Sequence, residues 1–440
     1  MENSVGNGMR GNLGSNLSLK NTTEKGLVEV LGYVISVAMI VQCRTIWMHL
    51  SDYGMVVNRT VFMVIAASLV LMIIAVNPGK NLISKIFIRS RRQYILAAAV
   101  AVYAAVFILL NPVNYLRVIR CAIILALMVV LFEPDRELIT VKGILNKYTN
   151  LVTILAAVAV FCWLAGSILK LFTATGYVVT DWTETGEDIK RYTFLHIYYE
   201  TQMLSSHIAR NTGIFTEAPM ASYTYCLALI SEFLVTRRRG VKRSVILVIA
   251  ILTTFSATGY LVIMMLAFYA AFLGRDHIRK LPRPVLGVIA VCLIGLIAGA
   301  ALVIYNKFIW GSGSIRTNDY IVGFHAWMAH PLVGGGFESL EYLQSFMPKW
   351  RAINCGYSNS PLQILGQGGI YLAVPYVYAF ARGVWNALYQ KDLNLMMYTV
   401  VMMVLMILTT IPYQYSTFYC LLILVYGGRL SWQDKGDYEA

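Results

Sequence analysis

Apolar segments recur along most of the chain and are separated by short polar or charged stretches. Each is about 17 to 25 residues long, the length at which an α-helix crosses a hydrocarbon core of about 30 Å. This pattern predicts an all-α polytopic integral membrane protein with about 12 transmembrane helices. We expect them to form a single transmembrane domain over residues 27–440.

The expected spans lie near 27–48, 60–77, 94–111, 113–132, 151–172, 218–236, 284–305 and 361–381, followed by a closing hairpin over 394–428 that turns near Pro412. The apolar run from Ser244 to Gly274 has basic residues at both ends, which places both ends in the cytoplasm. One helix there would be about 46 Å long, so we expect two shorter helices with a turn near Ser256–Gly259. Such a turn within the membrane must face protein or a water-filled cavity, which predicts a recessed polar floor.

Basic residues gather in the short loops, as in Ile88–Gln93, Arg237–Arg243 and Gly274–Arg283. These loops are cytoplasmic under the positive-inside rule. The net charge of +14 therefore reflects membrane topology rather than nucleic-acid binding. The same arrangement leaves two long extracytoplasmic loops, 173–217 and 306–360.

Composition supports this class and limits the chemistry. Hydrophobic residues make up 58% of the chain and charged residues 13%, with a mean hydropathy of +0.64, which is too apolar for a soluble surface. The seven cysteines are scattered singly, so no disulfide framework or CxxC metal site is expected. Residues 1–26, rich in Asn, Gly and Ser, are expected to form a disordered cytoplasmic tail.

The first outer loop contains an amphipathic stretch and an arginine of interest. Tyr192–Ala209 has aromatic and apolar residues at mixed three- and four-residue spacing, which predicts a helix lying along the membrane interface. This helix either covers a cavity or packs on the bundle. Arg210 follows, ahead of a helix start marked by Pro219. An arginine there can clamp a phosphate, or can be satisfied by lipid headgroups or water.

The order of short motifs in the outer loops is the most specific signal. Arg316 is followed by Trp327, then by Pro331-Leu-Val-Gly-Gly-Gly336, and then by Asn359-Ser-Pro-Leu-Gln363. Further motifs are Arg210–Pro219 and Thr253–Gly259. Taken together over residues 205–370, they resemble the O-antigen polymerase and ligase superfamily. The first five spans match that superfamily only in topology.

The resemblance implies a GT-C-like helical fold that transfers sugars at the outer face of a bacterial cytoplasmic (inner) membrane. The donor would be an undecaprenyl-pyrophosphate-linked oligosaccharide and the acceptor a sugar hydroxyl, in an inverting reaction without metal or other cofactor. Arg210 and Arg316 match the family's essential outer-loop arginines, and fixed cations suit a pyrophosphate leaving group. The lipid bilayer is a partner, a flippase and a chain-length regulator are candidate partners, and no nucleic acid is expected.

The candidate residues fall into two groups. The catalytic candidates are Arg210, Arg316, Asp319 and Glu338. The substrate-binding candidates are Arg117, Arg120, Glu217, His325, Gly334, Gly336, Tyr357, Ser358 and Asn359. Arg117 and Arg120 share one face near the outer end of a span, where they either snorkel to the surface or line the donor cavity. The Gly334–Gly336 turn admits a close backbone approach.

Spacing leaves the general base open among Asp319, His325, His330, Glu338 and Glu217. Ligases of this superfamily usually carry histidine before the asparagine of the Asn-x-x-Leu motif, whereas Ser358 stands there in this chain. That departure favours polymerisation of repeats into O-antigen, capsule or exopolysaccharide over ligase-type transfer to another acceptor. A lipid-linked oligosaccharide flippase or other transporter is a further alternative, but it would usually show two related halves, and the sequence shows no repeat.

Overall fold

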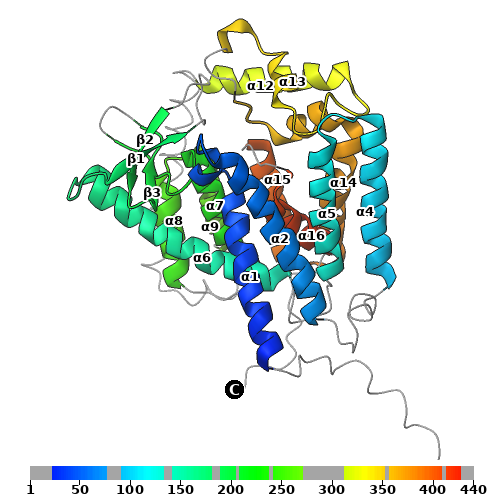
Figure 1. Cartoon of the computed structure of the whole chain (residues 1–440), viewed down its shortest axis with the longest axis horizontal. Helices are drawn as coiled ribbons and strands as arrows, with labels where there is room; N and C mark the ends of the chain where they lie inside the picture. Colours follow the sequence, from blue (N-terminus) through cyan, green and yellow to red (C-terminus); the bar gives the residue numbers. More distant parts are fainter. Residues whose placement is uncertain are drawn as a thin grey trace, which may run out of the picture.

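The computed structural model describes residues 22–76, 91–132, 141–180, 189–204, 208–236, 241–270, 312–351, 356–408 and 413–427. These parts of the chain are mostly helical (Figure 1). A small sheet and the helices α12 and α13 lie at the upper end of the bundle in that view. The predicted ninth span near 284–305, the turn residue Pro412 and most of the predicted tail lie outside the described residues.

The first helices pack against one another in a connected series. They are α1 (Thr22–Gln42), a 3-10 helix (Ile46–His49), α2 (Gly54–Val76), α4 (Arg91–Leu110), α5 (Tyr115–Leu131) and α6 (Val141–Cys162), which continues as a π-helix (Trp163–Ile168). Helix α1 packs against α2 and α6, while α5 packs against α2 and α4. The spans expected in this region are therefore present as helices, with boundaries that differ by up to ten residues at the start of α6.

The later helices include one that is almost entirely buried. They are α7 (Ala218–Ile230), which continues as a π-helix (Ser231–Thr236), α8 (Val241–Thr253), α9 (Ala257–Phe268), α14 (Ser360–Gln390), α15 (Leu393–Leu408) and α16 (Ser416–Gly427). Helix α7 is almost entirely buried and contacts α6, α8 and α9. Pro219 stands in its first turn, as its lack of an N–H predicts.

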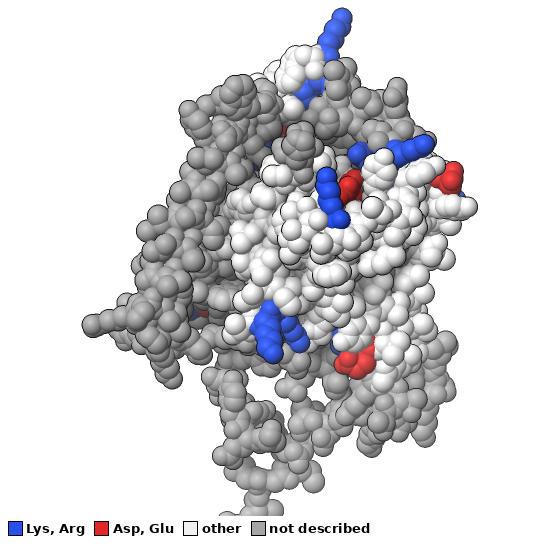
Figure 2. Space-filling view, turned by 90° about the vertical axis from the view of Figure 1, so that its left-hand side faces the viewer, with Lys and Arg blue, Asp and Glu red and all other residues white. Residues whose placement is uncertain are grey.

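Five helices within the described residues are long and apolar enough to cross a membrane. They cover Gly54–Ala75, Gln93–Leu110, Val141–Ile168, Ala218–Val235 and Ser360–Gln390. On the face shown in Figure 2, charged side chains gather at two levels with an uncharged band between them. These features support a multi-pass membrane protein.

The predicted pair of short helices between Ser244 and Gly274 is confirmed. Helix α8 ends at Thr253 and α9 begins at Ala257, so the turn comes about two residues earlier than expected. Thr254 and Ser256 of this turn are buried. The backbone N–H of Asn211 donates to the carbonyl of Thr253 over 3.0 Å, so the turn faces protein. The predicted turn inside the bundle thus contacts protein.

The predicted interfacial helix over Tyr192–Ala209 is wrong. The chain instead forms an antiparallel sheet in the order β1 (Gly176–Thr180), β2 (Ile189–Phe194) and β3 (Tyr198–Glu200). Tyr177 pairs with Tyr192 in its register. The segment is rich in tyrosine, threonine and other residues that favour strands, and its short apolar runs fit a two-residue period as well as a helical one.

The predicted loop 306–360 contains helices that were not predicted from the sequence. They are α12 (Ser312–Ala329), α13 (Leu340–Gln344) and a 3-10 helix (Lys349–Arg351). Helix α12 packs against α14, and α13 contacts both. Ser339 caps the start of α13 by accepting a hydrogen bond from the N–H of Tyr342.

A break in α14 receives the glycine-rich loop. Gly369 has left-handed, non-helical backbone angles (φ 61°, ψ −165°). The N–H of Gly335 donates to the carbonyl of Gly366 over 2.9 Å, and the N–H of Tyr371 donates to the carbonyl of Leu332 over 3.0 Å. A Cβ atom on Gly334 would lie 2.3 Å from the amide nitrogen of Gly368. The close approach predicted for this turn is therefore made to the backbone of α14.

Candidate functional site

A cavity of about 1020 Å³ lies where the ends of α1, α2 and α5 meet α12 and the start of α14. Its charged and imidazole side chains are Arg44, Arg59, Arg117, Arg120, Arg316, Glu217, Asp319, Glu338 and His49. Further polar lining comes from Gln42, Asn58, Asn114, Tyr357, Ser358, Gln363, Gln367 and Gln414. Residues far apart in the sequence thus converge on one polar chamber within an otherwise apolar bundle.

Eight of the sequence-derived candidates line this cavity. They are Arg117, Arg120, Glu217, Arg316, Asp319, Glu338, Tyr357 and Ser358. Both Arg117 and Arg120 are among the lining residues, and half of the Arg117 side chain is exposed. Arg210, His325, Gly334, Gly336 and Asn359 are not among its lining residues.

Each carboxylate of the cavity has an arginine partner. Arg44 Nη1 lies 3.3 Å from Glu217 Oε1. Arg117 Nη1 lies 3.4 Å from Glu338 Oε2. The third, Asp319, pairs through Oδ1 with Arg351 Nη1 at 2.9 Å. The negative charges of the chamber are therefore balanced within the chain.

Arg59, Arg120 and Arg316 are left to give the cavity a positive excess. Within the described residues, none of the three forms a hydrogen bond or ion pair, although Arg120 lies over the ring of Phe62 with 5.9 Å to its centroid. A guanidinium has five N–H donors in a planar fork that matches phosphate oxygens. A cavity with three such groups is suited to a multiply charged anion.

Asp319 is held by the protein on both oxygens. Its Oδ1 accepts from Arg351, while its Oδ2 accepts from the N–H of Ser358 at 3.0 Å and from the Ser358 hydroxyl. Asp319 and Arg351 side chains are each 1% exposed. The Tyr357 hydroxyl donates to the Asp319 carbonyl at 2.8 Å. This arrangement fixes residues 356–358 against α12 and occupies both carboxylate oxygens of Asp319.

Glu338 has the surroundings of a reactive carboxylate. Burial raises its pKa, and the neighbouring Arg117 and Arg120 oppose that rise. Its backbone is left-handed, with φ at 54°. Its N–H donates to the Tyr413 hydroxyl over 3.3 Å, which helps to hold this conformation.

Two other lining residues, Arg44 and Asn114, also have positive φ, at 53° and 58°. Strained backbone of this kind concentrates at functional sites.

Arg210 is engaged by acceptors outside the cavity. Its Nε donates to the Thr254 carbonyl over 2.9 Å and its Nη2 to the Phe255 carbonyl over 3.1 Å. Its Nη1 donates to Gln202 Oε1 over 3.3 Å, and this same oxygen accepts from the N–H of Ala218 over 2.9 Å. Arg210 thereby joins the turn between α8 and α9 to the start of α7, directly after Glu217.

The other candidates outside the cavity contact protein or solvent. His325 is exposed on α12, and His330 is exposed with its ring 5.9 Å from that of Tyr342. Asn359 caps α14, because its Oδ1 accepts from the N–H of Leu362 over 2.9 Å. Gly334 and Gly336 belong to the loop that docks on α14.

Sequence reasoning missed Arg44, Arg59 and His49. Arg44 lay inside the expected first span and Arg59 directly before the second. A charge at the end of an apolar segment was the signal that drew attention to Arg117 and Arg120, and the same signal applies to these two arginines. Within the described ranges, no group of three or more His, Cys, Asp or Glu residues is arranged to hold a metal ion.

Two family models match the chain. Residues 244–377 match the O-antigen ligase family, and residues 146–308 match the colanic acid polymerase family. The first match includes α8, α9, α12 and the first part of α14, and the second includes the sheet and α7. No curated protein matches the chain. The resemblance that the loop motifs predicted is confirmed.

Proposed function

Because both family matches support its membership of the O-antigen polymerase and ligase superfamily, we propose that this chain polymerises lipid-linked oligosaccharide repeats. The donor and acceptor are repeats carried on undecaprenyl pyrophosphate. The product is a surface polysaccharide such as O-antigen, capsule or exopolysaccharide. The matches support a polymerase or ligase in general, and the cavity supports the choice of donor chemistry.

The single observation that carries this proposal is the set of three arginines that have no hydrogen-bond or ion-pair partner within the described residues. Arg59, Arg120 and Arg316 line one chamber whose carboxylates already have partners. A pyrophosphate diester brings negative charge into the chamber, and departure of the sugar leaves still more on the oxygen atoms. Fixed guanidinium groups stabilise that developing charge without any reorganisation.

In the proposed reaction, the acceptor hydroxyl oxygen attacks the anomeric carbon of the donor sugar. The bond from that carbon to the pyrophosphate oxygen breaks, and undecaprenyl pyrophosphate leaves with the bonding electrons. Attack opposite the leaving group inverts the anomeric configuration. Glu338 accepts the hydroxyl proton, since its pKa is raised and it lines the chamber. No step requires a metal or another cofactor.

Arg210 acts as a positioning residue in this scheme. Its contact with Gln202 holds the N–H of Ala218, which fixes the backbone next to Glu217 at the cavity wall. Asp319 positions Tyr357 and Ser358 in the same sense. Glu217 and Arg44 form an ion pair in the cavity wall.

We place the cavity at the outer face of a bacterial cytoplasmic membrane. About 12 spans in a GT-C-like domain over residues 27–440 put both predicted loops, 173–217 and 306–360, on that side. In that location a flippase would deliver the repeats and a chain-length regulator would limit the product.

Ligase-type transfer is the second candidate, since residues 244–377 match the O-antigen ligase family. In that family's usual pattern a histidine stands where this chain has Ser358. Here the Ser358 hydroxyl donates to Asp319 and offers no base of histidine's strength. A transporter is favoured by no feature of the described residues.

The test is to delete the gene and separate the surface and lipid-linked glycans by size. Complementation uses the wild type, Arg316→Ala, Arg120→Gln and the control Arg382→Gln. Arg382 lies on α14, where it donates to the Tyr378 hydroxyl, and is not among the cavity residues. We expect glycan arrested at one repeat, with the ladder restored by the wild type and by Arg382→Gln only. Loss of a single fixed donor lowers turnover by about 10²–10³-fold.

Other outcomes would overturn the proposal in different ways. Full-length polymer stranded on its lipid carrier would identify a ligase. Repeats trapped on the inner leaflet would identify a transporter. Unchanged polymer with Arg120→Gln or Arg316→Ala, at normal protein levels, would remove these arginines from the donor site.

A further inference from the structure

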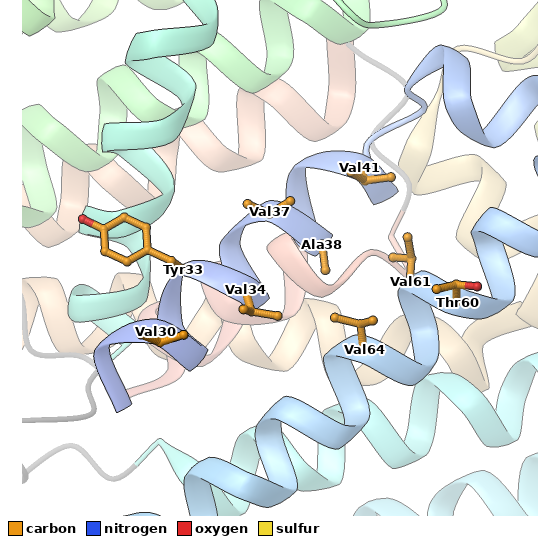
Figure 3. A pocket seen from close by; sticks show the side chains of 9 residues that line it. All are labelled: Val30, Tyr33, Val34, Val37, Ala38, Val41, Thr60, Val61 and Val64. Carbon is orange, nitrogen blue, oxygen red and sulfur yellow. The ribbon is translucent and has the colours of Figure 1, made fainter. Parts of the chain in front are cut away.

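A second cavity lies between α1 and α2, and its lining is apolar (Figure 3). Its volume is about 450 Å³. The α1 residues lining it are Val30, Tyr33, Val34, Val37, Ala38 and Val41, and the α2 residues are Thr60, Val61 and Val64. We name this cavity the α1–α2 groove. Val30, Val34 and Val37 are exposed, so the groove opens on the surface of the bundle.

The α1–α2 groove adjoins the arginine-lined cavity along both helices. On α1, Val41 of the groove is followed directly by Gln42 of the cavity. On α2, Arg59 of the cavity is followed directly by Thr60 of the groove. Figure 3 shows Val34 and Ala38 facing Val61 and Val64 across the space between the helices. On each helix the groove therefore begins one residue from the arginine-lined cavity, which brings the two within reach of one ligand.

We propose that the α1–α2 groove holds the polyprenyl tail of the lipid-linked substrate whose pyrophosphate binds in the arginine-lined cavity. This inference rests on the proposed function and adds where the lipid part of the substrate lies. From Val30 to Val41 the groove follows α1 for about 16 Å, roughly half of the hydrocarbon core. That length matches the part of a tail that descends from a headgroup through one leaflet.

Continuity of charge and apolarity identifies the occupant. When the anionic head of a lipid is bound in the cavity, its tail must extend out through an apolar opening. A hydrocarbon chain inside the polar chamber would lose the free energy gained by contact with other apolar groups. The groove supplies such an opening beside Arg59. Six of its nine lining residues are valine, whose branched side chains have few rotamers. The wall therefore has a fixed shape before the ligand binds.

The kinetic test obstructs the groove and compares donors that share a glycan pyrophosphate but differ in tail. The full-length chain is reconstituted in lipid nanodiscs, and each variant is assayed with an undecaprenyl donor and with a geranyl donor. Val34→Trp places a large ring in the groove. The matched control is Val102→Trp, because Val102 is a 63% exposed valine on α4 that lines neither cavity.

We expect Val34→Trp to raise KM for the undecaprenyl donor at least about tenfold, since overpacking removes the tail's contacts. It should leave kcat/KM for the geranyl donor near the wild-type value, and Val102→Trp should change neither. Equal effects of Val34→Trp on both donors, or no effect on the long one, would overturn the proposal.

A second measurement does not depend on catalysis. A benzophenone amino acid is placed at position 37 or at position 102 and irradiated with radiolabelled undecaprenyl pyrophosphate in nanodiscs of unlabelled phospholipid. Labelling at position 37 that excess unlabelled undecaprenyl pyrophosphate removes is the expected result. Labelling that is equal at both positions would assign the groove to bulk lipid. If position 37 is labelled but no donor is turned over by the wild type, the proposed function fails while the groove assignment stands.

Discussion

The sequence predicts the same role for Arg316 and Arg210, yet their surroundings in the structure are opposite. Arg316 lines the cavity and has no hydrogen-bond or ion-pair partner within the described residues. Arg210 donates to Thr254, Phe255 and Gln202 and lines no part of the cavity. One guanidinium is available to a ligand, while the other satisfies the carbonyls of a helix end.

The same division runs through the rest of the site. Among the residues that face the cavity, Glu338 has a left-handed backbone, and Arg120 has no hydrogen-bond or ion-pair partner within the described residues. Residues such as Gly334 and Asn359 make backbone contacts that fix where the cavity wall stands. The motifs therefore contain residues that face the substrate cavity and residues that hold its walls in place. Substitutions of the first kind should lower turnover, and substitutions of the second kind should lower stability.

The largest effect on turnover is expected at Glu338. Glu338→Gln removes the proposed base but keeps the size and polarity of the side chain. Turnover should fall by about 10²–10⁴-fold, the contribution typical of a positioned base. Thermal unfolding of the purified protein should change little. Rates of glycan extension in nanodiscs measure the first quantity. Turnover within threefold of wild type would place the base elsewhere, with Glu217 the next carboxylate to substitute.

A scaffold position should show the reverse pattern. At Gly334 the backbone is left-handed, with φ at 65°, and an added Cβ would meet the α14 backbone. Gly334→Ala is expected to lower the free energy of unfolding by about 2 to 5 kcal/mol, the sum of a left-handed alanine and a forced clash. Gly176→Ala is the matched control, because its Cβ would meet only Thr193 Cγ2 at 3.9 Å. Equal unfolding temperatures for the two variants would contradict the docking of this loop.

The positions of basic residues and the lengths of the apolar runs predicted the helical bundle well, because both are local properties of the sequence. The paired short helices α8 and α9 followed from basic residues at both ends of one apolar run. The sheet was not predicted, because the apolar residues after Ile189 fit the spacing of a strand as well as that of a helix. Only the pairing of β2 with β1 decides between the two structures.

The site was only half predictable for a related reason. The sequence motifs predicted Arg316, Glu338 and Ser358 as site residues, and all three line the cavity. The motifs could not predict that Asp319 forms an ion pair with Arg351. The two residues are far apart in the sequence, and they come together only when α12 packs against α14. Arg44 and Arg59 escaped notice because the family motifs lie in the later half of the chain.

Arg210 offers an intermediate case. Arg210→Ala leaves the carbonyls of Thr254 and Phe255 without their donor, which should cost about 1 to 3 kcal/mol of unfolding free energy. Turnover should fall less than with Glu338→Gln, and at lower temperature it should recover as the turn is retained. Unfolding curves and rates taken at two temperatures measure both quantities. An undiminished unfolding temperature together with complete loss of turnover would return Arg210 to direct contact with the donor.

The smallest effect concerns the pH at which the base works. Glu338 must be ionised to accept a proton, so turnover falls as pH drops through its pKa, which burial has raised. Arg117 opposes that rise, and Arg117→Gln should therefore move the acidic limb of the kcat profile to higher pH. Because half of the Arg117 side chain is exposed, solvent and salt screen the interaction, and the displacement should be small and smaller still in high salt. An acidic limb that moves to lower pH, or that persists in Glu338→Gln, would belong to a different group.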